Sequence, residues 1–265
     1  MDYTSRTLNR ACSADGTPIA YEQRGDGPAV VLVGGALDTA AAQTPLAELL
    51  ASHFSVFTYD RRGRGGSGDA AGYAVEREIE DLAAVIEEAG GRARVHGTSS
   101  GGALALRAAA AGLPITQLSV YEPPFDPITP SGRPVGDHLA RTRELVAVGK
   151  VDEALVLFLD LLGTPGPVIE HMRDFPGWSE LAATAHTLPY DYAVMGDRTV
   201  PVRLLHQVAV RVMVIEGGAS APSMREAARL VAEALPRGRH RTLTGQTHDV
   251  APHVLAPVVA AFFAS

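Results

Sequence analysis

The chain has 265 residues, 46% of them hydrophobic, which is enough to bury one sizeable core, and its net charge is −7 from 23 Lys plus Arg against 30 Asp plus Glu. No segment concentrates enough Lys or Arg to follow a phosphate backbone, so a nucleic-acid partner is not expected. No apolar run can cross a bilayer, residues 1–16 lack the apolar core of a secretory signal, and the single cysteine, Cys12, cannot form an internal disulfide. We therefore expect a cytoplasmic protein without membrane association, acting on a small molecule.

Short apolar segments alternate with longer amphipathic ones along most of the chain. This alternation predicts an α/β fold, in which helices cover a mostly parallel sheet. The predicted strands are Ile19–Gln23, Ala29–Val33, Ser55–Tyr59, Arg94–His96, Leu118–Tyr121, Val212–Ile215 and Arg241–Leu243.

Helical periodicity is clearest in VEREIEDLAAVIEEA, where apolar residues recur on one face and two glycines follow the last turn. Two later segments begin with a proline near the first turn, as helices often do. The predicted helices are Pro45–Ala51, Val75–Ala89, Gly101–Ala111, Ser223–Ala234 and Pro252–Ala264.

The alternation stops between residues 123 and 207. A proline-rich stretch leads into helical patterns at Asp137–Val148 and Val151–Leu162, and no strand of comparable quality follows. We interpret residues 123–207 as a helical lid inserted into a core of residues 1–122 and 208–265. Its larger apolar residues could line a pocket, although most of them would simply pack the lid. They are Phe125, Ile128, Phe158, Leu161, Leu162, Trp178, Leu181, Tyr190, Tyr192 and Met195.

A G-x-S-x-G pentapeptide, Gly97 to Gly101, lies between a predicted strand and a predicted helix. A serine on so sharp a turn takes strained backbone angles, and only small flanking residues let strand and helix pass closely. Ser99 is the residue flanked symmetrically by glycines, so we identify it as the candidate nucleophile. The alternative for Ser99 is that it serves only as the N-cap of the helix. Ser100 follows it and is expected to supply mainly its backbone amide.

With this motif the chain resembles the α/β-hydrolase fold family over nearly its whole length. VVLVGGALD resembles the family's strand and oxyanion loop, with Gly34 in place of the usual His and Ala36 where the family supplies an oxyanion amide. FTYDRRGRGGSG resembles a structural turn of the family, through Asp60, Arg62, Gly63, Gly65 and Ser67. The resemblance implies an eight-stranded, mostly parallel sheet flanked by helices, with an inserted helical lid.

The same turn contains a formal dinucleotide fingerprint, Gly63-x-Gly65-x-x-Gly68. Such a fingerprint must open an apolar helix directly after a strand, and here charged residues precede it and a polar loop follows. We therefore predict no cofactor. No metal is predicted either, because the chain has no H-E-x-x-H or similar ligand spacing.

A serine hydroxyl needs a base within hydrogen-bond reach. His248 lies in a loop between the last predicted strand and the terminal helix, where the family places its catalytic histidine. The family's usual acid is absent, because VMVIEGGASAP carries Ser220 at the position of the expected Asp. We favour Glu122, at the end of the strand after the Gly101–Ala111 helix, and keep Glu216 and Asp126 as alternatives.

The order Ser99, Glu122, His248 is the one that this fold uses for a catalytic triad. It predicts a serine hydrolase with an oxyanion hole formed by the amides of Ala36 and Ser100. The expected substrate is a small to medium, fairly hydrophobic ester, lactone or thioester. Two alternatives stay open, since a fold does not fix a function: another reaction on the same scaffold, such as C–C bond hydrolysis, a cyclase or lyase step or cofactor-free peroxidation, or a ligand-binding protein of low turnover.

Overall fold

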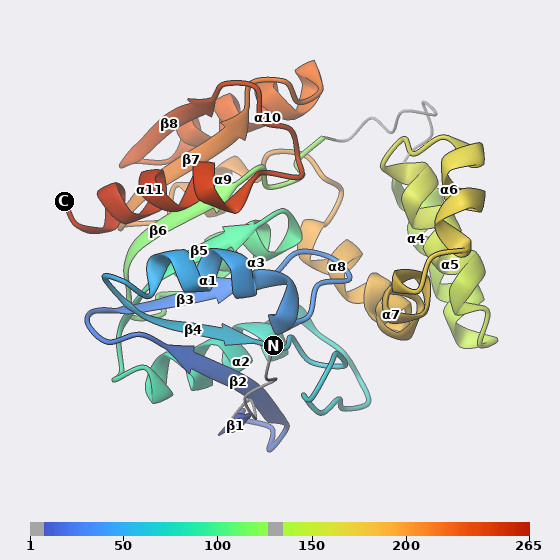
Figure 1. Cartoon of the computed structure of the whole chain (residues 1–265), viewed down its shortest axis with the longest axis horizontal. Helices are drawn as coiled ribbons and strands as arrows, with labels where there is room; N and C mark the ends of the chain where they lie inside the picture. Colours follow the sequence, from blue (N-terminus) through green and yellow to red (C-terminus); the bar gives the residue numbers. More distant parts are fainter. Residues whose placement is uncertain (1–7, 127–134) are drawn as a thin grey trace.

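One eight-stranded sheet organises the protein in the computed structural model, which describes residues 8–126 and 135–265 (Figure 1). The strand order is β1-β2-β4-β3-β5-β6-β7-β8. β1 pairs with β2, and β2 with β4, in antiparallel fashion, whereas the other neighbours are parallel. The strands are β1 (Asn9–Cys12), β2 (Pro18–Arg24), β3 (Ala29–Val33), β4 (Ser55–Tyr59), β5 (Ala93–Thr98), β6 (Ile115–Tyr121), β7 (Arg211–Gly217) and β8 (Gly238–Leu243).

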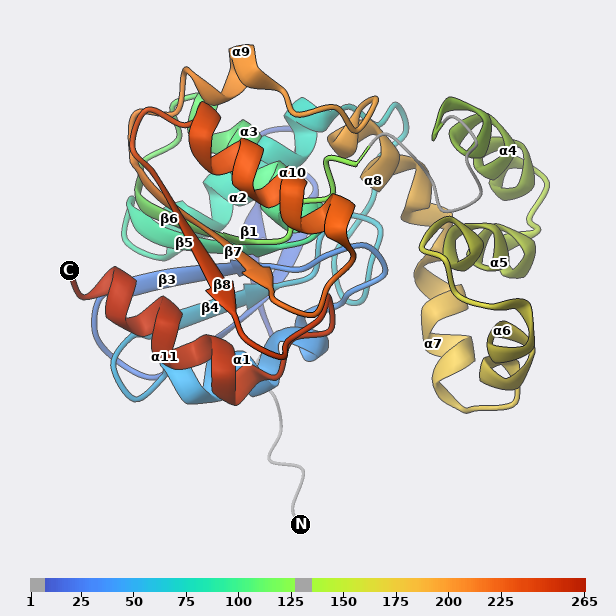
Figure 2. The same ribbon diagram turned by 90° about the horizontal axis from the view of Figure 1, so that it is seen from above.

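Helices cover both faces of the sheet (Figure 2). One face packs against α1 (Thr44–Leu50) and α11 (Pro252–Phe263), with the short 3-10 helix η1 (Ala40–Gln43) leading into α1. The other face packs against α2 (Val75–Glu88), α3 (Ser100–Ala110) and α10 (Pro222–Ala234). The parallel strands other than the edge strand β8 are therefore buried on both sides, which is why their sequences are rich in apolar residues.

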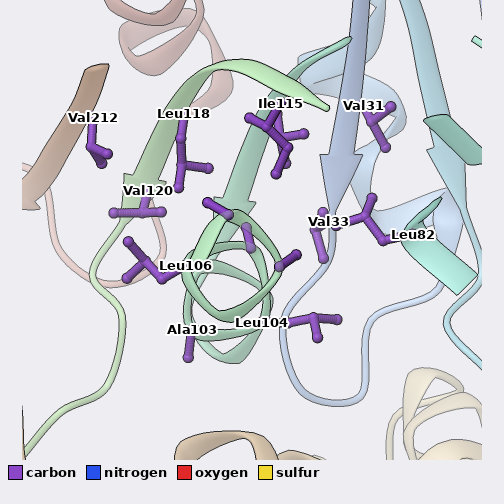
Figure 3. Packing of buried hydrophobic residues seen from close by; sticks show 14 of the residues in the cluster. Val31, Val33, Leu82, Ala103, Leu104, Leu106, Ile115, Leu118, Val120 and Val212 are labelled. Atoms are coloured by element: carbon purple, nitrogen blue, oxygen red, sulfur yellow. The ribbon is translucent and has the colours of Figure 1, made fainter. Parts of the chain in front are cut away.

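The centre of the larger core cluster lies between α3 and the sheet (Figure 3). Leu104 and Leu106 are completely buried there, close to Val33 of β3 and Val120 of β6. This packing fixes the start of α3, and with it the turn from β5, relative to the strand ends on either side.

Residues 135–195, between β6 and β7, are largely helical and lie beyond the carboxyl ends of the parallel strands (Figures 1 and 2). Their own apolar cluster includes Leu155, Trp178 and Tyr192, and Leu37 of the loop after β3 packs into it. We call residues 135–205 the helical segment. Its elements are α4 (Val135–Ala147), α5 (Val151–Leu161), α6 (Gly166–Arg173), α7 (Gly177–Thr184), the 3-10 helix η2 (Ala185–Thr187), α8 (Leu188–Met195) and α9 (Val202–Leu205).

Sequence and structure agree on the seven predicted strands, with ends that differ by a few residues. The pattern did not reveal β1, an edge strand that alternates exposed and buried residues, nor the short helices α6 to α9. Ile128 of the predicted lid lies outside the described residues. Among the helices of the described ranges, none combines the length and the apolar character needed to span a bilayer.

Candidate active site

Ser99 lies at the turn between β5 and α3, in a left-handed backbone conformation with φ 53° and ψ −125°. A non-glycine residue held there costs roughly 1–3 kcal/mol, so the surroundings must impose it. The two flanking glycines show how. A Cβ on Gly97 would come within 2.5 Å of the Gly101 carbonyl oxygen, and one on Gly101 within 2.3 Å of the Val33 carbonyl oxygen. The close passage of strand and helix predicted from G-x-S-x-G is therefore present.

Glu122 and His248 are in direct contact, although 126 positions separate them in the chain. His248 Nδ1 lies 2.8 Å from Glu122 Oε2, and Glu122 Oε1 accepts a 2.7 Å hydrogen bond from the Gly217 amide. Glu122 itself has a positive φ of 42°, and its amide donates to the Ile215 carbonyl at 2.9 Å. The Glu122 carboxylate is thus fixed at the carboxyl end of the sheet, next to the imidazole.

The surroundings keep this carboxylate ionised. Burial alone would raise the pKa of Glu122, but the His248 imidazole, the nearby Ser220 hydroxyl and the Gly217 amide outweigh burial and leave the pKa below its ordinary value. Ser220, at the position of the family's usual Asp, thus lies beside the relocated acid. Tyr121 also steadies the loop of His248, because its hydroxyl donates to the Thr247 carbonyl.

The two alternative acids lie elsewhere. Glu216 accepts a hydrogen bond from Thr242 Oγ1 at 2.9 Å, and its other neighbours are Arg225 at 3.5 Å and His240 at 3.4 Å. Asp126 lines a cavity together with His248 but makes no ion pair with it among those found in the described ranges. Within these ranges, Glu122 is the candidate acid that bonds to the imidazole.

Ser99 and His248 face the same space. Both line a cavity of about 540 Å³ and an adjoining one of about 160 Å³. The hydrogen bonds of the described residues do not include one between the Ser99 hydroxyl and His248 Nε2. Catalytic contacts of this kind are often long in an unliganded site and shorten in the complex with substrate.

Two backbone amides adjoin the serine. Ser100 begins α3, so its N–H belongs to the first turn, where no carbonyl of the helix can accept it. The Ala36 N–H lies in the loop after β3, and Gly35 of that loop approaches so closely that a Cβ on it would stand 3.3 Å from Ser99 Cβ. In the part of the chain that the structure describes, neither amide is hydrogen-bonded. Ala36 and Ser100 both line the smaller cavity together with Ser99.

A buried ionic network holds both of these amides in place. Asp191 of α8 is fully buried and accepts from Arg61 Nη1 at 2.7 Å, from the Ser100 hydroxyl at 2.7 Å and from Arg64 Nη2 at 2.6 Å. Arg64 Nη1 donates to the Gly35 carbonyl at 2.6 Å, directly before Ala36. One carboxylate of the helical segment therefore connects the start of α3 with the loop after β3.

The electrostatics of this network favour ionised groups. Burial by itself would raise the pKa of Asp191, but Arg64, Arg61 and Ser100 together lower it below its ordinary value. Arg61 also forms a two-bond pair with Glu78, at 2.6 and 2.7 Å. Such paired, fully bonded charges are the arrangement that a dry interior tolerates.

Sequence reasoning did not identify Arg61, Arg64, Glu78 or Asp191 as buried charges near the site. Three arginines directly after a buried strand, and an acid in the otherwise apolar segment LPYDYAVM, were signals that could have pointed to buried charges. The pairing of Arg64 with Asp191 spans 127 positions, however, and no local pattern reveals a contact at that separation.

The apolar residues predicted for the lid divide into two groups. Phe158, Leu161, Leu162, Leu181 and Met195 line the two cavities beside Ser99. Phe125, Trp178 and Tyr192 are buried in packing, and Tyr190 stacks on Tyr73 with ring centroids 3.9 Å apart. Among the described residues, no group of three or more His, Cys, Asp or Glu is placed to hold a metal ion.

Comparisons with known proteins agree with the overall fold. The model of the Alpha/beta hydrolase family matches residues 30–261. The chain is 49% identical to an alpha/beta hydrolase from Sphaerobacter thermophilus DSM 20745, over 96% of this chain and 100% of that one, with a TM-score of 0.89. The enol-lactonase from Burkholderia xenovorans LB400 is similar in fold, with a TM-score of 0.73 and 19% identity over 97% of this chain and 100% of that one.

A curated relative covers less of the chain. The uncharacterized hydrolase YraK of Bacillus subtilis (strain 168) is 35% identical over 102 residues, which are 37% of this chain and 38% of YraK. The match therefore spans well under half of that protein.

Proposed function

The chain belongs to the alpha/beta hydrolase family, and we propose that it is a serine hydrolase that cleaves a carboxylic ester, lactone or thioester through an acyl-enzyme. The observation that carries this proposal is the strained turn that presents Ser99 at the cavity where His248 is paired with Glu122. A base held by a buried carboxylate is what an otherwise inert hydroxyl needs.

In the proposed reaction, His248 takes the proton from Ser99 as the hydroxyl oxygen attacks the carbonyl carbon of the substrate. Negative charge then develops on the carbonyl oxygen, and the amides of Ala36 and Ser100 stabilise it. His248 passes the proton to the leaving oxygen or sulfur as that bond breaks. A water molecule, deprotonated by His248, then attacks the acyl carbon. The bond to the Ser99 oxygen breaks, His248 returns the proton to that oxygen, and the acid leaves. Glu122 stabilises the imidazolium in both halves of the reaction.

The cavities support a substrate of modest size with apolar parts. The larger cavity, about 540 Å³, lies between the core and the helical segment, where Phe158 and Leu181 meet the loop after β3. Volumes of this order suit a small organic molecule. We accordingly propose that residues 123–207 act as a cap over a core of residues 1–122 and 208–265, and that the cap selects the substrate.

An active-site-directed fluorophosphonate tests the proposal. We expect covalent labelling of the wild-type protein, complete loss of labelling in Ser99→Ala and no loss in Ser52→Ala, which removes an exposed hydroxyl. Peptide mapping should place the label on Ser99, and short p-nitrophenyl esters should be hydrolysed. Folded protein that stays unlabelled and inactive would refute the proposal, as would label on another serine.

A further inference from the structure

The smaller cavity holds a buried cation beside the candidate nucleophile. Its volume is about 160 Å³, and Ser99, His248, Phe158 and Met195 line it together with Arg198. Arg198 follows α8 and is only 7% exposed. Arg198 therefore borders the same cavity as Ser99 and His248.

Arg198 is held in place by its backbone and by one hydrogen bond. Its Nε donates to the Pro124 carbonyl at 2.9 Å, which directs the side chain toward the end of β6. Its φ of 60° lies in the left-handed region, a conformation that costs a non-glycine residue free energy and persists only where the surroundings enforce it. Among the hydrogen bonds of the described residues, none involves the two terminal nitrogens of this guanidinium, so both can take a ligand.

Arg198 differs from the other buried arginines in its ion pairing. Arg61, Arg62 and Arg64 are at most 2% exposed, and each forms an ion pair with a buried carboxylate. The ion pairs among the described residues do not include Arg198. Asp126 lines the same cavity and raises the pKa of Arg198, whereas burial, the larger influence, lowers it. The guanidinium nevertheless stays protonated, since arginine does not lose its proton in proteins.

Burying a cation without a paired anion costs free energy, because the cation loses its hydration. A carboxylate bound to the cation offsets this cost through charge-assisted hydrogen bonds. The planar fork of a guanidinium fits the two oxygens of a carboxylate. A phosphate dianion would bring two negative charges to a cavity that Asp126 also lines, so a group with a single negative charge is repelled less. The structure thus favours a monoanionic, planar group as the occupant.

On the basis of the proposed function, we propose that the cavity at Arg198 is a subsite for a free carboxylate of the substrate. The substrate is then an ester, lactone or thioester that carries a second, anionic carboxyl group. With a volume of about 160 Å³, the cavity has room for a carboxylate on a short aliphatic chain.

Matched esters test this subsite. On the acyl side, the mono-p-nitrophenyl esters of succinate, glutarate and adipate are compared with the p-nitrophenyl esters of the neutral acids of equal chain length. On the alcohol side, acetyl esters of short ω-hydroxy acids are compared with those of the corresponding alcohols. In one of the two sets, the wild-type protein should show a higher kcat/KM for the anionic ester than for its neutral partner.

Substitution assigns that preference to Arg198. A charge-assisted hydrogen bond is typically worth a 10- to 100-fold difference in affinity. We therefore expect the ratio of kcat/KM, anionic over neutral, to fall about 10- to 100-fold in Arg198→Gln and to recover in part in Arg198→Lys. Arg203→Gln, which removes an exposed arginine of α9, should leave the ratio unchanged.

A binding measurement separates failure of the subsite from failure of the hydrolase proposal. Glutarate should bind to Ser99→Ala in calorimetry, and more weakly to Ser99→Ala/Arg198→Gln, whether or not the protein turns over esters. Glutarate should also slow fluorophosphonate labelling of the wild-type protein. A protein that is labelled at Ser99 but neither prefers anionic esters nor binds dicarboxylates would overturn the subsite and leave the hydrolase intact. If folded wild-type protein is not labelled but Ser99→Ala still binds glutarate through Arg198, the hydrolase proposal alone falls.

Discussion

Replacing Asp191 by asparagine tests whether the buried network both stabilises the protein and holds the amides beside Ser99. The carboxamide introduced by Asp191→Asn could accept at only one atom, while the structure directs three donors at the carboxylate, from Arg61, Arg64 and Ser100. Arg61 would keep its pair with Glu78, but Arg64 would lose its carboxylate partner.

The expected loss of stability is large. Removing one partner of a buried ion pair costs about 3–5 kcal/mol, because the remaining charge stays buried. At roughly 2–4 °C for each kcal/mol in a protein of this size, the melting temperature should fall by about 10 °C. Calorimetry and urea unfolding measure this change. Glu144→Gln, which breaks an exposed pair with Arg141, is the matched control and should change stability by less than about 0.5 kcal/mol.

Kinetics test the second part of the reasoning. Arg64 bonds the carbonyl before Ala36, and Asp191 bonds Ser100, so both amides of the proposed oxyanion hole should shift in Asp191→Asn. Complete loss of one oxyanion donor costs about 100- to 1000-fold, so we expect a partial shift to lower kcat about 10- to 100-fold, with a much smaller change in KM. A variant as stable as the wild type, or one whose defect lies only in KM, would refute the reasoning.

Two further perturbations address the acid and the response to pH. Glu122→Gln should lower kcat on p-nitrophenyl esters by about 10⁴-fold, as expected when an imidazole loses its orienting carboxylate, whereas Glu216→Gln should cost less than about tenfold; the reverse order would show that Glu216 is the acid. His96 is completely buried, and burial lowers its pKa from 6.5 to about 4. The unfolded chain therefore binds a proton at this residue between these pH values while the folded protein does not, so about 3 kcal/mol of stability should be lost as the pH falls from 6.5 to 4. Urea titrations across this range should give a flatter profile for His96→Gln, and an unchanged slope would contradict the interpretation.

The central sheet was predictable because its signals are local. The buried strand β3 is an uninterrupted apolar run and β4 is rich in β-branched and aromatic residues, and prediction and structure agree on both strands to the residue. β8, at the edge of the sheet, has the polar sequence GRHRTL, so only its last residues, Arg241–Leu243, were predicted. The helices α6 to α9 lie among prolines and glycines, and they are too short for a helical pattern of apolar residues to be recognised.

Parts of the candidate site were also predictable. The turn at Ser99 followed from its two glycines, and the pairing of Glu122 with His248 was inferred from strand order once Ser220 had replaced the usual acid. The contacts of Asp191 and the buried position of Arg198 depend on how the helical segment folds back onto the core. Such long-range packing leaves no periodic trace in a single sequence.

The most direct measurement of the central claim is mass spectrometry of the protein during turnover of p-nitrophenyl acetate. The account predicts a burst of one p-nitrophenolate per protein molecule, together with a mass increase of one acetyl group that peptide mapping places on Ser99. In Glu122→Gln the burst should become slow, and in Ser99→Ala it should be absent. Steady hydrolysis by Ser99→Ala at the wild-type rate, or an acetyl group on any other residue during turnover, would contradict it.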